Sequence, residues 1–342
     1  MSSSLTHHRW IVRLPMARAV LAGTLLVACS LNLPQARGGS IGTEYVVLGF
    51  HQDPAAGLVL DHVGDAQQPY AYQLGDTDMW SVDLRDPNGN IVTIEPSRAT
   101  FQFILSSWTD GFMATWQQVT SPAIPGESFD VNVIADISGE DRVVEFSIDV
   151  LTNTPNHALY ALRFPRIEVI ASAPGTDVLS YPYVGGWLLP DPTHNPVVEA
   201  STGIPVPQPG PMSMQWLAYY DAADPEGLAL FTGTRDGYGY RKGYILGQGQ
   251  LGVSWTFAVR HVPEENLTPD NEYAAQYNCV LGVVPGDWYD AAQFYRQWAL
   301  TRSWADNGPI YRNDAFSEYL RNAQMFAVNS LSDETHPEYF DY

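Results

Sequence analysis

Aromatic and ionisable side chains occur together in a proline-rich stretch between residues 181 and 212. Tyr183 and Trp187 precede Asp191 and His194 there, and prolines stand at positions 182, 190, 192, 196, 205, 207, 209 and 211. Prolines restrict the backbone, so the rings lose little conformational entropy on binding a ligand. Aromatic faces can pack on the C–H groups of sugars while carboxylates accept hydrogen bonds from hydroxyls. The stretch is a candidate carbohydrate-binding site; alternatively, its rings close one end of the fold.

A second candidate site is the glycine-rich segment from residue 235 to residue 242. It combines the charged residues Asp236 and Lys242 with the tyrosines Tyr238 and Tyr240. This combination also suits sugar binding, whereas the alternative is the solvated tip of a hairpin.

Other chemistry finds little support in the sequence. The histidines are scattered without a second ligand at helical spacing, and the only cysteines are Cys29 and Cys279, so no metal site is predicted. Residues 247–252 match the letters of a nucleotide-binding GxGxxG motif. That motif requires a following helix, whereas a strand pattern follows here. We therefore expect no cofactor and no metal.

The N-terminus has the features of an export signal. Basic residues precede an apolar run from Ala19 to Ala28, which is too short for a membrane-spanning helix. The run ends in Leu26–Cys29, which resembles the lipobox of bacterial lipoproteins. That resemblance implies lipid attachment at Cys29 and a periplasmic or cell-surface location. Alternatively, an ordinary signal is cleaved a few residues later and Cys29 is discarded.

Composition narrows the class of partner. The chain has 17 basic and 38 acidic residues, with a formal net charge of −21. Such a surface repels a phosphate backbone, which argues against nucleic acid as a partner. Contact with a membrane is expected only through the N-terminal lipid. Apolar residues make up 45% of the chain and aromatic residues 12%, enough for a large core.

Most of the chain follows the pattern of β-strands. Apolar and polar residues alternate from 144 to 150, from 251 to 259 and from 273 to 283, the period of a strand with one buried face. Turn sequences separate such segments, for example Asp86–Asn90. We therefore predict a mainly β protein built as a large antiparallel two-sheet super-sandwich from 43 to 285.

A helix is predicted only near the end. Asp287 can cap a segment in which Trp288, Tyr295 and Trp298 recur at helical spacing. At least part of this face is expected to dock on the sandwich.

The same region carries a resemblance to a known family. It looks like the exit from a galactose-mutarotase-like super-sandwich, a module of several glycoside-hydrolase clans and of a related bacterial family of unknown function. Across roughly residues 43–305, the resemblance is carried by Phe164-Pro165, Leu179–Pro182, Gly185–Trp187, Gln215–Asp221, Thr234–Asp236, Lys242, Gly286–Ala292 and Tyr295–Ala299. It implies that the helix leads into a (β/α)₈ barrel that carries the catalytic carboxylates.

The residues after 305 are far fewer than the roughly 200–250 that a barrel needs. We therefore expect a signal peptide (1–28), a tether (29–42), the sandwich (43–285), a linker helix (286–305) and a truncated barrel start or disordered tail (306–342), with no catalytic residue. The expected function is the non-catalytic sandwich of an exported glycoside-hydrolase-like protein acting on poly- or oligosaccharide, with the missing barrel as its partner. The alternatives are a freestanding carbohydrate-binding lipoprotein, or a sugar epimerase that pairs His157, His194 or His261 with Glu199.

Overall fold

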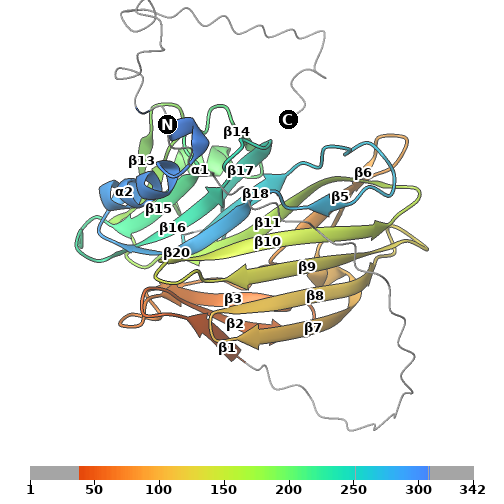
Figure 1. The fold of residues 1–342 in the computed structure, drawn as a ribbon, viewed down its shortest axis with the longest axis horizontal. Helices are drawn as coiled ribbons and strands as arrows, with labels where there is room; N and C mark the ends of the chain where they lie inside the picture. Colours follow the sequence, from red (N-terminus) through yellow and green to blue (C-terminus); the bar gives the residue numbers. More distant parts are fainter. Residues whose placement is uncertain (1–37, 251, 307, 309–342) are drawn as a thin grey trace, which may run out of the picture. The chain divides into compact units, whose positions relative to one another are not determined.

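A computed structural model describes residues 38–250, 252–306 and 308 (Figure 1). The expected signal peptide, Cys29 and nearly all of the expected barrel start at 306–342 lie outside these residues. The segment boundaries expected from the sequence remain predictions. The first described strand nevertheless falls within the expected tether, and it buries Ile41.

Three antiparallel sheets account for the strands of the described residues. This confirms the prediction of a mainly β, antiparallel protein, but the strands form three sheets where two were predicted. The ten-stranded sheet runs in the order β13 (Trp187–Pro190), β12 (Asp177–Tyr181), β15 (Trp216–Asp221), β16 (Leu228–Arg235), β20 (Asn278–Pro285), β10 (Val143–Asn153), β9 (Ser128–Asp136), β8 (Gly111–Thr120), β7 (Thr100–Trp108), and β19 (Tyr273–Ala274) pairs with β10. The six-stranded sheet consists of β14 (Val206–Gln208), β17 (Lys242–Gln248), β18 (Ser254–His261), β11 (Ala158–Ile170), β5 (Ser81–Arg85) and β6 (Ile91–Ile94). The four-stranded sheet consists of β1 (Gly38–Gly42), β2 (Val47–Asp53), β3 (Gly57–Gly64) and β4 (Tyr72–Gln73).

The core lies between the ten-stranded sheet and the two smaller sheets. A bridge between Leu74 and Val169 joins the four-stranded sheet to β11. Rings from both layers meet in the core: Trp80 packs edge-on against Trp116 with centroids 5.8 Å apart. Along β10, apolar side chains alternate inward as the sequence predicted, which gives the strand one buried face.

Two predicted strands differ from the structure. The segment 251–259 begins its strand only at Ser254, because the Val253 amide closes a turn onto the Gln250 carbonyl. The segment 273–283 is divided into β19 and β20, because the backbone leaves the ladder after Ala275 and the Tyr277 ring stacks on His261. A five-residue helix that the sequence did not suggest, α1 (Pro196–Ala200), is capped by Asn195.

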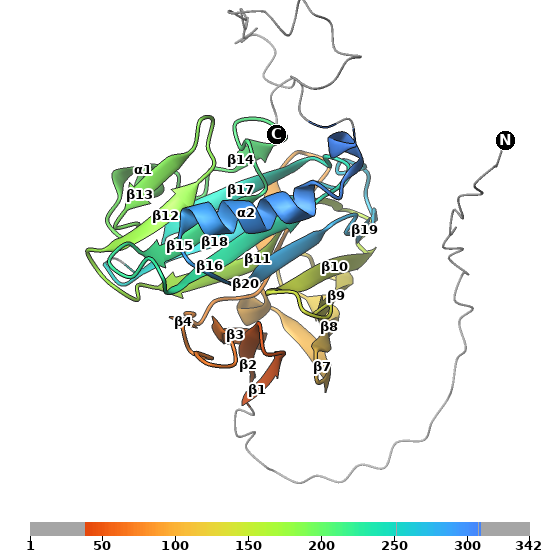
Figure 2. The same ribbon diagram turned by 60° about the vertical axis from the view of Figure 1, so that its left-hand side comes forward.

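The predicted C-terminal helix is present as α2 (Trp288–Ala299), and it lies on the outer face of β15, β16 and β20 (Figure 2). The Asp287 carboxylate accepts a hydrogen bond from the Tyr289 amide, as expected of a cap. Phe294 and Tyr295 contact the sheet, whereas Trp288 remains 40% exposed. Only part of the predicted aromatic face therefore docks.

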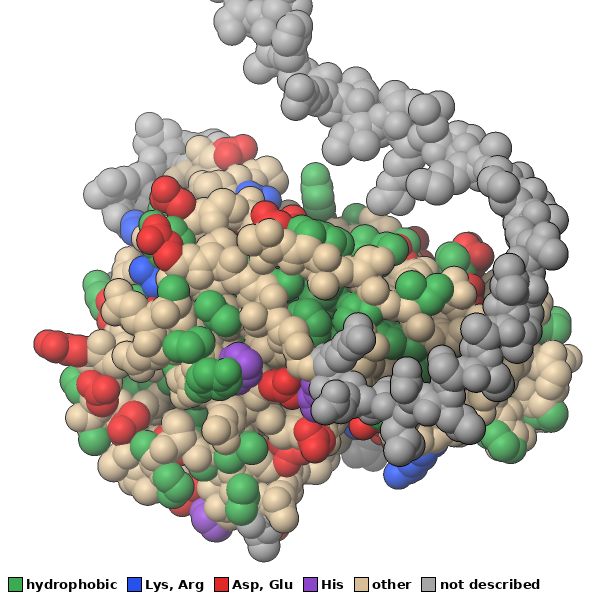
Figure 3. Space-filling view, turned by 90° about the horizontal axis from the view of Figure 1, so that it is seen from below, with side chains coloured by type: hydrophobic (Ala, Val, Ile, Leu, Met, Phe, Trp, Pro, Cys, Tyr) green, Lys and Arg blue, Asp and Glu red, His purple; other side chains and the backbone are tan. Residues whose placement is uncertain are grey.

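Two 3₁₀ turns, η1 (Pro96–Arg98) and η2 (Ser303–Ala305), complete the described elements. None of the described helices combines the length and apolar character needed to cross a membrane. Acidic side chains are scattered over the face in Figure 3, where lysine and arginine are few, as the net charge indicates.

Candidate functional site

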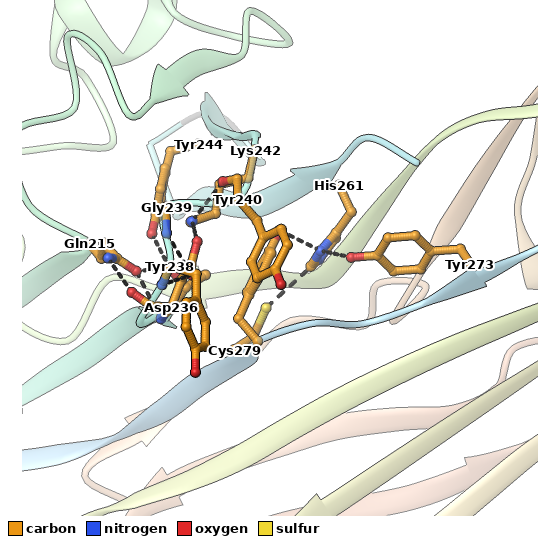
Figure 4. Close-up of polar contacts among 12 residues, drawn as sticks. Gln215, Asp236, Tyr238, Gly239, Tyr240, Lys242, Tyr244, His261, Tyr273 and Cys279 are labelled. Atoms are coloured by element: carbon orange, nitrogen blue, oxygen red, sulfur yellow. Dashed lines mark hydrogen bonds and ion pairs between the residues drawn. The ribbon is translucent and has the colours of Figure 1, made fainter. Parts of the chain in front are cut away.

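A buried ion pair lies at the connection that leads from β16 in the ten-stranded sheet to β17 in the six-stranded sheet (Figure 4). The Lys242 Nζ lies 2.5 Å from the Asp236 carboxylate, and neither side chain is exposed to solvent. The ammonium also donates to the Tyr240 carbonyl and lies 4.4 Å from the centroid of the Tyr277 ring. Burial lowers the pKa of Lys242, and the Asp236 partner opposes that shift. The two opposite charges therefore compensate each other inside the fold.

The Gln215 side chain and two hydroxyls hold this connection in place. Gln215 precedes β15 and makes two hydrogen bonds to the Asp236 backbone. Its amide nitrogen donates to the Asp236 carbonyl (2.9 Å), and its amide oxygen accepts from the Asp236 N–H (3.0 Å). The same oxygen accepts a hydrogen bond from the Thr234 hydroxyl, which lies 2.6 Å from the Tyr244 hydroxyl. Because Thr234 uses its single proton on Gln215, Tyr244 is the donor in that second contact. These bonds satisfy buried polar atoms of the connection between the two sheets.

Next to the ion pair, His261 is fixed by three partners. Its Nε2 lies 2.7 Å from the Phe164 carbonyl oxygen, which can only accept, so the proton is on Nε2. The hydroxyls of Tyr273 and Tyr277 lie within 3.0 Å of Nδ1. Burial, and then the charge of Lys242, lower the pKa of His261 to about 4. The imidazole is therefore neutral at pH 7 and is an acceptor for the two tyrosines.

A cavity of about 570 Å³ opens beside this network. Three tyrosines contribute to its wall, Tyr240, Tyr273 and Tyr277. The remainder of the wall is mainly polar and includes Arg241, Asn266, Gln276 and three glutamates, Glu264, Glu265 and Glu272. Aromatic surface, carboxylate acceptors and amide and guanidinium donors together suit a ligand with many hydroxyl groups.

The buried ion pair changes the role expected of two predicted site residues. Asp236 and Lys242 are close together, but both are withdrawn from solvent, so neither contacts a ligand directly. Their place in the structure is behind the cavity wall formed by Tyr240 and Tyr277.

The predicted aromatic residues Tyr183 and Trp187 lie at the end of the ten-stranded sheet where β16 ends. Tyr183 and Trp187 are in contact, with ring centroids 4.8 Å apart, and Trp187 is 41% exposed. The strand register places Trp187 opposite Tyr181, two strands from Gln215. With strands about 4.8 Å apart, β13 lies about 14 Å from β16, which leads into the connection that holds Asp236.

The other two predicted residues, Asp191 and His194, lie at the opposite end of that sheet. Asp191 follows the last residue of β13, about 13 Å along the strand from Trp187. Its carboxylate lies 3.1 Å from His194 Nδ1 and accepts a hydrogen bond from the Thr193 hydroxyl, which lowers the pKa of Asp191. The structure therefore divides the proline-rich stretch into two sites rather than one, and a carbohydrate contact at either remains a prediction.

The histidine–glutamate pair considered for an epimerase is not formed as expected. Within the described part of the chain, Glu199 forms no hydrogen bond or ion pair with His157, His194 or His261. His157 pairs instead with Glu127, at 2.5 Å, and the Asn156 amide shares that carboxylate. This pairing fixes a turn.

Sequence reasoning missed most of the cavity wall. Residues 264–277 follow a strand and show no motif, and the useful signal was their clustering of three glutamates with two tyrosines. Among the described residues, no three histidine, cysteine or acidic side chains come together as a metal site.

Two comparisons of the amino-acid sequence find similar proteins. Residues 273–340 match the family described as "Domain of unknown function (DUF6259)". A Monosiga brevicollis protein named "Putative glycoside hydrolase 22789" is 32% identical over 116 residues, which are 32% of this chain and 10% of that protein.

A solved structure shows the same kind of fold over most of this chain. An α-N-acetylgalactosaminidase from Bifidobacterium bifidum superposes with a TM-score of 0.53 and 12% identity, over 78% of this chain and 39% of its own. A GH36 α-galactosidase from Geobacillus stearothermophilus gives a TM-score of 0.48 and 11% identity, over 81% of this chain and 43% of its own. The chain thus spans less than half of these proteins, and the first similarity shows a fold shared with part of a glycoside hydrolase.

Proposed function

We propose that this chain is the carbohydrate-binding, non-catalytic sandwich of an exported glycoside-hydrolase-like protein that acts on poly- or oligosaccharide. The observation that carries the proposal is the 570 Å³ cavity, whose wall combines tyrosines with glutamates, amides and an arginine. The fold shared with part of a glycosidase and the sequence similarity to a putative glycoside hydrolase support the same conclusion.

The chemistry of the cavity favours binding over hydrolysis. Glycoside hydrolysis needs two carboxyl groups on either side of the bond, and the general acid is normally held in an apolar pocket. Glu264, Glu265 and Glu272 are all exposed to solvent. Exposed carboxylates suit hydrogen bonds to sugar hydroxyls, so we assign them to recognition.

The proposal includes a catalytic partner of the (β/α)₈ barrel type and a sandwich of the galactose-mutarotase-like type. Along α2 and η2, Trp288, Tyr289 and Trp304 are between 40% and 55% exposed. Exposed aromatic side chains at both ends of this segment favour a contact surface there, which supports a neighbouring domain at this helix. A freestanding carbohydrate-binding lipoprotein is the second candidate, favoured by the resemblance of Leu26–Cys29 to a lipobox.

Binding to the cavity can be tested with a pair of charge-matched variants. We expect isothermal titration calorimetry with a panel of oligosaccharides to identify a ligand, and Glu264→Ala/Glu265→Ala to weaken it about tenfold, because hydrogen bonds to charged groups contribute roughly 1.5–3 kcal/mol. The control Glu140→Ala/Glu226→Ala removes two exposed glutamates from distant turns. Equal weakening by both pairs would contradict a site in the cavity, and so would the absence of any saccharide ligand.

A further inference from the structure

Arg260 is a buried arginine on the outer face of the six-stranded sheet. Its neighbours on β18, Val259 and His261, are part of the interior, and alternation along the strand directs Arg260 to the other face. The residue is only 8% exposed, and its guanidinium carbon lies 5.5 Å from the centroid of the Tyr160 ring. Among the described residues, no carboxylate oxygen lies within 4 Å of its nitrogens.

The surroundings leave this charge without a full counterion. The residue directly opposite on β11 is Arg163, another cation. The nearest carboxylate, Asp83, is already bound to Arg163 at 3.0 Å and to the Thr93 hydroxyl at 2.6 Å. Burial lowers the pKa of Arg260, Tyr160 and the charge of Asp83 oppose that shift, and the charge of Arg163 adds to it. An arginine nevertheless remains charged in proteins, and a buried charge without a partner is unfavourable.

A small recess lies against Arg260. Its volume is about 10 Å³, room for a single atom of the size of a water oxygen. Pro205 and Gly243 form part of its wall, and no aspartate or glutamate contributes to it. A Cβ on Gly243 would lie 2.7 Å from Pro205 and 3.8 Å from the Arg260 side chain, so the glycine is needed to leave this space open.

The recess adjoins the proposed sugar cavity. Arg241 and Val262 line both spaces. A ligand in the cavity that extends one group past these two side chains would reach Arg260. The glutamates of the cavity wall disfavour an anionic group in the cavity itself, so a charged ligand is directed with its anion toward the recess.

We propose that Arg260 binds one anionic oxygen of the saccharide in the neighbouring cavity, and that the ligand is therefore a sugar carrying a carboxylate or a sulfate ester. This inference rests on the proposed function for its sugar and on Arg260 alone for its anion. The chain is strongly acidic, with a net charge of −21, so recognition is of a single anionic group at short range, where salt screens little of the attraction.

The test compares the full-length protein with two arginine variants. Arg260→Gln removes the charge at the recess, whereas Arg85→Gln removes the other guanidinium that lies over Tyr160, at 5.7 Å, and does not line the recess. Affinities are measured by calorimetry for a neutral oligosaccharide, a uronic-acid oligosaccharide and a sulfated one of equal length. Inorganic sulfate and sodium acetate are the sugar-free probes. Their binding is measured as a rise in the temperature of thermal unfolding at constant ionic strength.

We expect at least one acidic oligosaccharide to bind about tenfold more tightly than the neutral one, and Arg260→Gln alone to remove that preference while leaving neutral binding unchanged. Comparison of the uronic-acid and sulfated ligands identifies the anion. Equal affinity for neutral and acidic sugars would overturn the inference, and so would an equal loss for both sugars in Arg260→Gln. If no sugar binds but sulfate or acetate stabilises the wild type and not Arg260→Gln, the anion site stands and the sugar proposal fails. If neither anion stabilises the wild type and no sugar binds, both are overturned.

Discussion

Acidification is predicted to destabilise the protein through His261 in a defined pH range. The pKa of His261 is about 4 in the folded protein, against about 6.5 for an exposed histidine. Between these values the unfolded chain takes up a proton that the folded chain does not. The contribution of His261 to stability is therefore complete above pH 6.5 and is lost as the pH falls toward 4.

The size of the effect follows from the difference between the two pKa values. It corresponds to about 3 kcal/mol in total, with a slope of at most about 1.4 kcal/mol per pH unit. The physical cause is the closed environment: Nδ1 faces the Tyr273 and Tyr277 hydroxyls, and a charged imidazole would lie near Lys242. Carboxyl groups with a lowered pKa, such as Asp191, change the stability below about pH 3.8, which lies outside the pH range in which His261 changes it.

The assay is urea unfolding at pH 7, 6, 5 and 4, followed by tryptophan fluorescence. His261→Gln can still accept from a tyrosine and donate to the Phe164 carbonyl but cannot titrate. We expect it to be less stable at pH 7, because the ring stack on Tyr277 is lost, and to have a much smaller pH slope. His194→Gln, at an exposed histidine, is the control and should keep the wild-type slope.

Burial also lowers the pKa of His62, so a small residual slope is expected in His261→Gln. Burial raises the pKa of Asp177, which acts in the opposite direction but is common to all three proteins. An unchanged slope in His261→Gln would refute the reasoning. So would a nuclear magnetic resonance titration in which His261 takes up its proton near pH 6.5.

Two further predictions concern the ion pair and the N-terminus. Lys242→Met leaves the Asp236 carboxylate buried without its cation and should reduce the free energy of unfolding by roughly 3–5 kcal/mol, while Lys242→Met/Asp236→Asn should recover much of that loss; a double variant as unstable as the sum of both single changes would contradict a coupled pair. If Cys29 accepts a lipid, the full-length protein should incorporate labelled palmitate and fractionate with membranes, and Cys29→Ser should abolish the labelling; an unlabelled wild type would remove the lipoprotein proposal.

The local elements were predictable because neighbouring residues encode them. The alternation from 144 to 150 became β10, since a period of two can bury only one face of a strand. The spacing after Asp287 became α2 with the cap in the expected place. Both patterns are complete within a dozen residues, so no distant contact was needed to recognise them.

Tertiary structure alone decided which polar residues are buried and which of them meet. Arg260 stands at an outward position of β18, where solvent exposure is the usual result, yet Pro205 and neighbouring residues cover it. The sequence suggested a solvated turn for Asp236 and Lys242, but in the structure Gln215, which precedes β15, bonds the Asp236 backbone and both charged side chains are buried. The burial of a charge depends on which distant segment lies over it, and that is set by strand order and register, which the local sequence does not encode.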